Sequence, residues 1–333
     1  MNLNYNSETK WLPDGFHFLG PTESSNRRSL INQFTKYLFD VGYSEVTVPA
    51  FDYSVSFLNQ ISPEEEHSVL KLRDLQGREI SPGTDLTVQV VKGMAGLSHI
   101  AENQKVFYVA RRIRDHKKKN ASRREVLQVG AECIGSSNPE DILRILQESD
   151  HLLKNSNLKK RPTIVLSNNR LIRSILSRLS LDATSINQLT YFIHTKNSSE
   201  ILKFVQLFNL KKAYGDIIIE LTHTLDIEKI REVLTSFAKQ EDFDFSKDLT
   251  ELSKVVKLWY EGDRFSDLCV DLSLVRDLKY YTGFLFQGFL ESESEPVLTG
   301  GQYDNLYEIF SGKEMPACGF AIHIDTLESS LGD

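Results

Sequence analysis

The chain contains a long helical segment between two segments that are typical of strands. Residues 155–255 are rich in Leu, Ile, Lys, Ser and Asn, contain one glycine, and repeat apolar residues at helical spacing, as in "NNRLIRSILSRLSL". After them, "YYTGFLFQGFL", "PVLTGGQYDNL" and "ACGFAIHIDTL" indicate short strands broken by glycines. Strands before and after a helical segment predict one sheet that is closed by distant parts of the chain. We therefore expect an α+β fold with a first part (1–154), a helical insertion (155–255) and a second part (256–333).

Within residues 1–154, the sequence predicts helices that alternate with strands. "TESSNRRSL" opens with Ser/Thr caps, and an apolar face of Leu30, Phe34, Leu38 and Val41 precedes Gly42, which indicates a helix of about 16 residues. The other expected elements are a strand in "SEVTVPAFDY", two short strands around a glycine turn at 70–81, a helix that begins near Asp85 or Thr87, a hairpin of "KVFYVARRIRD" and "REVLQVGAECIG" around a basic loop, and an amphipathic helix at 139–153.

Composition excludes several classes of function. The net charge is -7, and a globally acidic chain is not built to coat nucleic acid. Eight of the fourteen residues from 111 to 124 are nevertheless Lys or Arg, so this basic segment is either a solvated face or a surface for an anion or a partner. The odd, widely spaced cysteines Cys133, Cys269 and Cys318 favour neither a zinc site nor a disulfide framework.

The ends and apolar runs of the sequence indicate where the protein works. The N-terminus "MNLNYNSETKWLPDG" lacks the pattern of a signal peptide. No apolar run approaches the roughly 18 residues that a membrane-spanning helix needs. We expect a cytoplasmic protein without a metal, a cofactor or a membrane segment.

The stretch "LVRDLKYYTGFLFQG" (274–288) has two interpretations. Taken alone, it is a buried strand with tyrosines at the rim of a sheet, in which Arg276 pairs with Asp271 or Asp277. The surrounding sequence favours a binding site, because six short segments occur in the order in which histidyl-tRNA synthetases carry them. These segments are "LPDGFHFLGPTESSNRR", "GYSEVTVPAFDY", "DLT", "QVGAE", "LVRDLKYYTG" and "GGQYDNL". The chain thus resembles the histidyl-tRNA synthetases over residues 12 to about 327.

This resemblance implies a fold and a set of contacts. The fold is the class II synthetase core, a mixed and mainly antiparallel sheet of six or seven strands flanked by helices, which pairs with a second copy through residues 24–53. In the synthetases the matching positions hold the amino acid. The histidine-binding residues implied here are Asp85, Thr87, Arg114, Gln128, Glu132, Arg276, Tyr280, Tyr281, Gly301 and Tyr303.

The ATP side of the synthetase pattern is altered. Arg114 keeps the arginine of motif 2, but His116 stands where a glutamate that contacts ATP is expected. In motif 3, Asp325 replaces a glutamate and Thr326 replaces the arginine that neutralises the triphosphate. Gly83 takes the place of the arginine of the "LRPE" segment. The resemblance therefore implies that amino acid binding is retained while catalysis is lost.

The family that fits this pattern is that of the regulatory subunits of ATP phosphoribosyltransferase, paralogues of the synthetases without an anticodon-binding domain. Because the sequence ends at Asp333, soon after the motif 3 match, we expect no such domain here. The family implies a short-form catalytic subunit as partner in a hetero-oligomer, a hetero-octamer by expectation, with histidine as effector and no tRNA. The basic segment, with Arg111, Arg112 and Arg124, is a candidate border with that subunit.

Two other functions stay open at this point. One is an active enzyme, either a truncated histidyl-tRNA synthetase or an amino acid ligase with the same adenylation chemistry. The other is a histidine-binding module that acts alone. The altered motif 3 disfavours the enzyme, and nothing in the sequence separates a module from a subunit.

Overall fold

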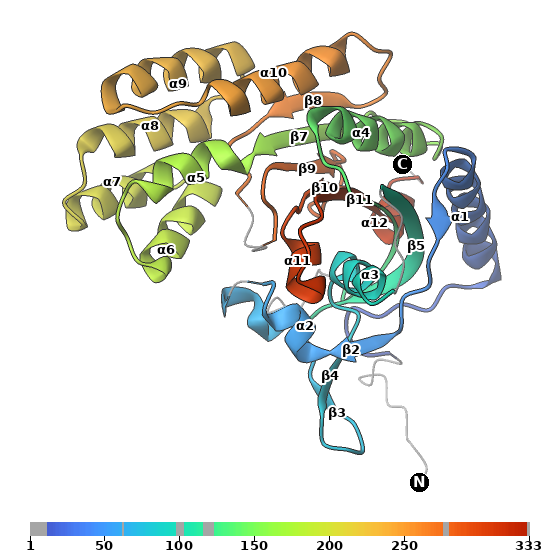
Figure 1. Cartoon of the computed structure of the whole chain (residues 1–333). Coiled ribbons are helices and arrows are strands. Elements are labelled where there is room, and N and C mark those ends of the chain that lie inside the picture. Colours follow the sequence, from blue (N-terminus) through green and yellow to red (C-terminus); the bar gives the residue numbers. More distant parts are fainter. Residues whose placement is uncertain (1–11, 62, 98–102, 116–122, 276–279, 332–333) are drawn as a thin grey trace, which may run out of the picture.

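A central sheet organises the molecule. The computed structural model describes residues 12–61, 63–97, 103–115, 123–275 and 280–331. Within this part of the chain, eight strands form one sheet in the order β1-β5-β6-β11-β10-β9-β7-β8 (Figure 1). The pairs β1–β5 and β7–β8 are parallel, and the other neighbours are antiparallel. The expected mixed, mainly antiparallel sheet is confirmed, with eight strands instead of six or seven.

The strands come from both ends of the sequence, as predicted. They are β1 (Ser44–Glu45), β5 (Gln104–Ile113), β6 (Glu125–Ile134), β7 (Thr163–Asn168), β8 (Asp267–Val270), β9 (Phe284–Phe289), β10 (Leu298–Gln302) and β11 (Ala317–His323). The predicted hairpin is present as β5 and β6, which pair over their whole length. Because β11 pairs with β6, the last strand of the chain closes the sheet against the first half.

Helices cover the sheet on both faces. One face is covered by α1 (Pro21–Asp40), α4 (Pro139–Lys154) and α12 (Ile324–Ser329), whose apolar residues share one core with the sheet. The other face carries α3 (Leu86–Ala95) and α11 (Leu306–Ser311), which pack beside each other on a second core. Successive side chains of a strand alternate between the faces. In β6, Cys133 therefore joins the first core, while its neighbour Glu132 faces α3.

A bundle of six helices extends from one end of the sheet (Figure 1). These helices are α5 (Asn169–Ser177), α6 (Ala183–His194), α7 (Ser198–Leu207), α8 (Lys212–His223), α9 (Ile227–Glu241) and α10 (Ser246–Tyr260). They start later than residue 155, because β7 lies inside the range expected to be helical and pairs with β8 and β9. Short apolar runs such as "TIVLSN" carry no periodicity that separates a buried strand from a helix. Whether the helices form an independent insertion stays a prediction.

A small second sheet lies next to α3. It consists of β2 (Phe51–Tyr53), β4 (Glu79–Pro82) and β3 (Leu72–Arg73), in that order, and α2 (Ser54–Leu58) and the 3-10 helix η1 (Pro63–Ser68) lie between β2 and β3 in sequence. The two strands expected at 70–81 are thus confirmed. The strand expected in "SEVTVPAFDY" is split into β1 and β2, which belong to different sheets with Pro49 between them. None of the helices in the described ranges is long and apolar enough to cross a bilayer.

Candidate functional site

Eight of the ten residues implied to bind an amino acid lie on the face of the sheet that carries α3. They come from four places: Asp85 and Thr87 at the start of α3, Gln128 and Glu132 on β6, Tyr280 and Tyr281 ahead of β9, and Gly301 and Tyr303 at the end of β10. Except for Thr87, these residues are buried. Segments almost 200 residues apart in sequence thus meet in one polar cluster; Tyr280 and Asp85, for example, are 195 positions apart.

Glu132 is the centre of this cluster. Its Oε1 accepts a hydrogen bond of 2.8 Å from the Thr87 hydroxyl, and its Oε2 accepts one from the Tyr303 hydroxyl. Burial raises the pKa of the Glu132 carboxyl to about 8, although the bonds from Tyr303 and Thr87 favour the ionised form. A buried carboxyl held by two donors is ready to ionise once a cation lies beside it.

Asp85 joins α3 to the tyrosine segment. It is the N-cap of α3 and accepts a 3.2 Å bond from the backbone N–H of Val88, so of the two predicted helix starts, Asp85 and Thr87, Asp85 is the cap. Its other oxygen, Oδ2, accepts a 2.9 Å bond from the Tyr280 hydroxyl and lies 3.4 Å from Nη2 of Arg114. Arg114 also donates through Nε to the Thr84 carbonyl at 2.8 Å. Arg114 therefore neutralises Asp85 and fixes the start of the helix.

Aromatic rings form one side of the cluster. Tyr280 lies 4.8 Å from Tyr281 and 6.1 Å from Tyr303 between ring centroids, the latter pair edge to face. Burial raises the pKa values of the Tyr280 and Tyr303 hydroxyls well above their usual range, so both remain neutral donors. Their rings offer an apolar wall with polar tips, which suits a planar heteroaromatic group.

Tyr108 is a member of the cluster that the sequence analysis missed. It lies on β5, fully buried, where it opposes Gly130 of β6, and a side chain at Gly130 would collide with its ring. Burial, and after it the neighbouring Glu132 and Asp85, raise the pKa of its hydroxyl well above the usual range, and the Thr87 side chain contacts the same hydroxyl. Tyr108 therefore belongs to the polar cluster. A tyrosine opposite a glycine in the neighbouring strand could have pointed to Tyr108, but only if the register of β5 and β6 had been known.

Two glycines make room for the polar side chains. A Cβ at Gly301 would lie 2.7 Å from the ring of Tyr281, so this position needs a residue without a side chain, as the sequence implied. Gly319 of β11 opposes Glu132, and a Cβ there would overlap the carboxylate. The sequence analysis did not single out Gly319, whose signal was a lone glycine within the strand segment "ACGFAIH".

Gln128 lies on the same face of β6 as Glu132, four residues away, and opposes His323 of β11. It is buried on that face. Arg276 and His116 lie outside the described residues, and their expected roles stay predictions.

The described ends of the basic segment are paired with acids. Arg111 lies 3.2 Å from Glu125, and Arg124 lies 2.8 Å from Asp115. These pairs lower the positive charge that the segment offers to a partner or an anion. Its role as a border with another protein stays a prediction.

The motif 3 position holds an ionic anchor. Asp325 is buried at the start of α12, where Oδ1 accepts from Arg27 at 2.8 Å and from Arg123 at 3.0 Å. Its Oδ2 accepts a 2.6 Å bond from the backbone N–H of Leu127. Arg27 also pairs with Glu328. Asp325 thereby joins α12 to α1 and to β6, on the face of the sheet opposite the polar cluster.

Replacement of Asp325 by asparagine is expected to destabilise the protein by about 1.5 to 3 kcal/mol, because it removes the charged acceptor of the hydrogen bonds from Arg27, Arg123 and the Leu127 backbone. Urea unfolding at pH 7 measures this change. The control is Asp263→Asn, which removes an exposed pair with Lys154 and is expected to cost less than about 1 kcal/mol. Equal effects of the two variants would contradict the anchor.

Comparison with known proteins identifies the class first. The family model described as "Histidyl-tRNA synthetase" matches residues 15–327. A crystal structure described as an ATP phosphoribosyltransferase regulatory subunit/histidyl-tRNA synthetase from Bacillus halodurans C has the same fold, with a TM-score of 0.82, 22% identity, and coverage of 96% of this chain and 83% of that chain. The chain therefore belongs to the histidyl-tRNA synthetase family and has its class II synthetase fold.

Within this family, the sequence relatives are more specific. An ATP phosphoribosyltransferase regulatory subunit of Leptospira interrogans is 44% identical, over 99% of this chain and 96% of that protein. A protein of the same name from Caldanaerobacter subterraneus is 29% identical over 96% of this chain and 83% of its own length. The chain belongs to the family of ATP phosphoribosyltransferase regulatory subunits.

Proposed function

We propose that this chain is a non-catalytic regulatory subunit of ATP phosphoribosyltransferase, and that it binds histidine at the polar cluster around Glu132. In this role it activates a short-form catalytic subunit and mediates feedback inhibition by histidine in the first step of histidine biosynthesis. The observation that carries the proposal is the contrast between the two sides of the synthetase pattern. The amino acid residues form one connected buried cluster, whereas Asp325 and Thr326 replace the ATP pair.

The chemistry of the cluster supports histidine as the ligand. The ammonium group of histidine can donate to the Glu132 carboxylate, which Thr87 and Tyr303 already hold in place. The approaching cation favours the ionised form of that carboxyl. The rings of Tyr281 and Tyr303 offer faces and hydroxyls to an imidazole. Arg276 is the expected partner of the ligand carboxylate by its match to the synthetase motif.

Feedback inhibition needs a difference in affinity. Histidine shifts the complex toward low activity only if it binds that state more tightly than the active one. A coupling free energy of about 1 to 3 kcal/mol is typical, which corresponds to roughly 5- to 150-fold in affinity. Strands β9 and β10, which border the cluster, connect it to the helical bundle through Arg170 of α5, whose Nη2 lies 3.4 Å from Asp304. This contact offers a path by which ligand binding reaches the bundle.

Assembly is part of the same proposal. We infer a hetero-oligomer with the catalytic subunit, a hetero-octamer by expectation, in which two copies of this chain pair through residues 24–53. Large apolar side chains on this segment support the pairing, because Phe39, Phe51 and Tyr53 are 52%, 48% and 42% exposed. We place the complex in the cytoplasm and expect no tRNA to bind it.

The test is reconstitution with a short-form catalytic subunit, followed by histidine titration of the phosphoribosyltransferase activity. Histidine is expected to inhibit the wild-type complex. In Glu132→Ala and Tyr281→Ala, the histidine concentration for half-inhibition is expected to rise about 10-fold or more, since each change removes a buried contact to the ligand. Size-exclusion chromatography with light scattering checks that both variants still assemble.

Three outcomes are distinguishable. Lost inhibition with retained assembly supports the histidine site. Unchanged inhibition in both variants places the sensor elsewhere in the complex. Failure of the wild-type chain to bind or activate the catalytic subunit contradicts the regulatory function itself. Glu291→Gln, on the exposed surface and paired with Lys160, is the matched control and is expected to behave as wild type.

A further inference from the structure

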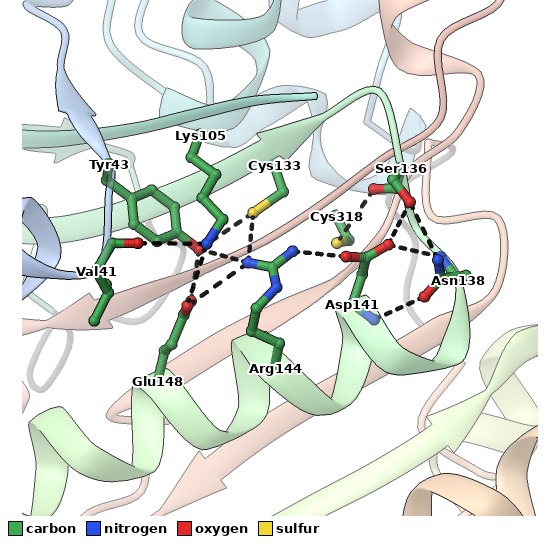
Figure 2. A network of polar contacts seen from close by, with 10 residues as sticks. All are labelled: Val41, Tyr43, Lys105, Cys133, Ser136, Asn138, Asp141, Arg144, Glu148 and Cys318. Atoms are coloured by element: carbon green, nitrogen blue, oxygen red, sulfur yellow. Dashed lines mark hydrogen bonds and ion pairs between the residues drawn. The ribbon is translucent and has the colours of Figure 1, made fainter. Parts of the chain in front are cut away.

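Two cysteines face each other across the centre of the sheet. Cys133 of β6 and Cys318 of β11 are direct partners in the antiparallel ladder, and both side chains are drawn in Figure 2. They belong to the core on the face of the sheet opposite Glu132. Two residues further along, the N–H of Gly135 donates to the carbonyl of Pro316 at 2.8 Å. Hydrogen-bonded pairs alternate along an antiparallel ladder, so Cys133 and Cys318 also form such a pair, with Cα atoms about 5.5 Å apart. This separation lies within the roughly 4.4 to 6.8 Å that a disulfide spans.

The surroundings of Cys133 favour its thiolate. Its sulfur lies 3.3 Å from Nη1 of Arg144 and 3.2 Å from the hydroxyl oxygen of Tyr43, which donates its proton to Glu148. The thiol of Cys318 donates to the backbone carbonyl of Ser136 at 3.7 Å. Contact with the Cys318 thiol and the charge of Arg144 lower the pKa of the Cys133 thiol, while the same contact and burial raise that of Cys318. Cys133 is thus the nucleophile of the pair, and Cys318 is the thiol that follows.

Other charged groups of the network act on the cations (Figure 2). Glu148 lies 3.6 Å from Arg144 and 3.9 Å from Lys105, and Asp141 lies 2.7 Å from Arg144. Arg144 and Lys105 are about one third exposed, at 29% and 31% of their side chains. Solvent therefore reaches the edge of the network, one side chain away from the buried sulfur of Cys133.

We propose that Cys133 and Cys318 are a reversible oxidation site, at which hydrogen peroxide as the oxidant converts the two thiols into an intramolecular disulfide. The Cys133 thiolate attacks a peroxide oxygen, so that an S–O bond forms, the O–O bond breaks, and the leaving hydroxide takes a proton to become water. Cys318 then loses its proton and attacks the sulfur of the resulting sulfenic acid. The S–S bond forms, the S–O bond breaks, and a second water leaves. Two thiols and one peroxide thus give one disulfide and two waters.

The chain carries its own control. Cys269, the remaining cysteine, is more exposed than the pair but is paired in register with Val165 instead of another cysteine. Burial raises the pKa of its thiol, so it is the slower nucleophile. Exposure alone therefore predicts oxidation at Cys269, whereas the proposed site predicts oxidation at the buried pair.

The experiment treats the full chain with a small excess of hydrogen peroxide and counts free thiols after denaturation under acid quench. The count is expected to fall from three to one, with dithiothreitol restoring three, and peptide mapping under non-reducing conditions is expected to link the peptides of Cys133 and Cys318. In Cys318→Ser, dimedone is expected to trap a sulfenic acid on Cys133. Cys269→Ser is expected to retain the link.

The wild-type map alone decides the proposal, even if a serine variant folds poorly. Persistence of all three thiols overturns it, as does an intermolecular disulfide through Cys269. Oxidation of Cys133 to a sulfinic acid without any link to Cys318 also contradicts it, because Cys318 then fails to act as the resolving thiol. Because the readout is the covalent state of the thiols, this result is independent of histidine binding.

Discussion

Histidine affinity is expected to fall about 100-fold when Glu132 is replaced by glutamine, because a hydrogen bond to a charged group contributes roughly 1.5 to 3 kcal/mol and tenfold in affinity corresponds to about 1.4 kcal/mol. Glutamine keeps the shape of the side chain but has no charge to offer the ligand ammonium. Its amide group also places a donor where Tyr303 or Thr87 already donates. Isothermal titration calorimetry of the isolated chain measures the change.

The dependence of this affinity on pH gives a second readout of the same contact. In the free protein, burial raises the pKa of Glu132 to about 8, so the carboxyl is mostly protonated at pH 7. A ligand ammonium favours the ionised form and lowers that pKa in the complex. Binding between pH 7 and 8 therefore releases a proton, and affinity rises with pH up to about 8 and then levels off. In Glu132→Gln the proton release is expected to disappear.

Titrations in two buffers of different ionisation enthalpy count the released proton. The window from pH 7 to 8 avoids most of the titration of the ligand imidazole, whose usual pKa is about 6.5. Glu291→Gln is the control and is expected to keep both affinity and proton release. If wild type and Glu132→Gln bind equally well, Glu132 is a structural residue and the ligand ammonium lies elsewhere.

Local patterns were sufficient to predict the elements that build the site. The apolar run "REVLQVGAECIG" predicted strand β6, while the resemblance to the synthetases singled out Gln128 and Glu132. In the strand these two residues lie on one face, because they are four residues apart. The start of α3 was predicted near Asp85 or Thr87, and the structure shows that Asp85 is the cap, which accepts from the backbone N–H of Val88. Such predictions succeed because the information lies within a few residues.

Contacts between distant segments were not predictable in the same way. Tyr108 joined the cluster because it opposes Gly130, which depends on a strand register that the sequence does not give directly. Asp325 was interpreted only as a lost catalytic residue, whereas in the structure it binds Arg27 and Arg123, about 300 and 200 positions away. Strand β7 was assigned to a helical segment, because its short apolar run becomes a strand only through pairing with β8 and β9.

The ion pairs of Asp325 also bear on whether the chain retains the adenylation chemistry of the synthetases. Adenylation places a carboxylate next to the triphosphate, and each charge-stabilising group at such a centre typically contributes about 10²- to 10³-fold in rate. Thr326 supplies no cation at the motif 3 position, and Asp325 engages Arg27 and Arg123 on the other face of the sheet. These arginines are committed to the fold, so they are poorly placed to replace the missing charge.

Histidine-dependent exchange of pyrophosphate into ATP is therefore expected to stay at background, at least about 10³-fold below a histidyl-tRNA synthetase assayed in parallel. A high concentration of the chain and saturating histidine make the comparison strict, since weak ligand binding then does not limit the signal. Thr326→Arg shows how much one restored cation contributes, and it is expected to remain near background because Gly83 and His116 also depart from the synthetase pattern. Exchange clearly above background that Arg276→Ala abolishes assigns the activity to this site. That result replaces the regulatory function with an amino acid adenylating enzyme.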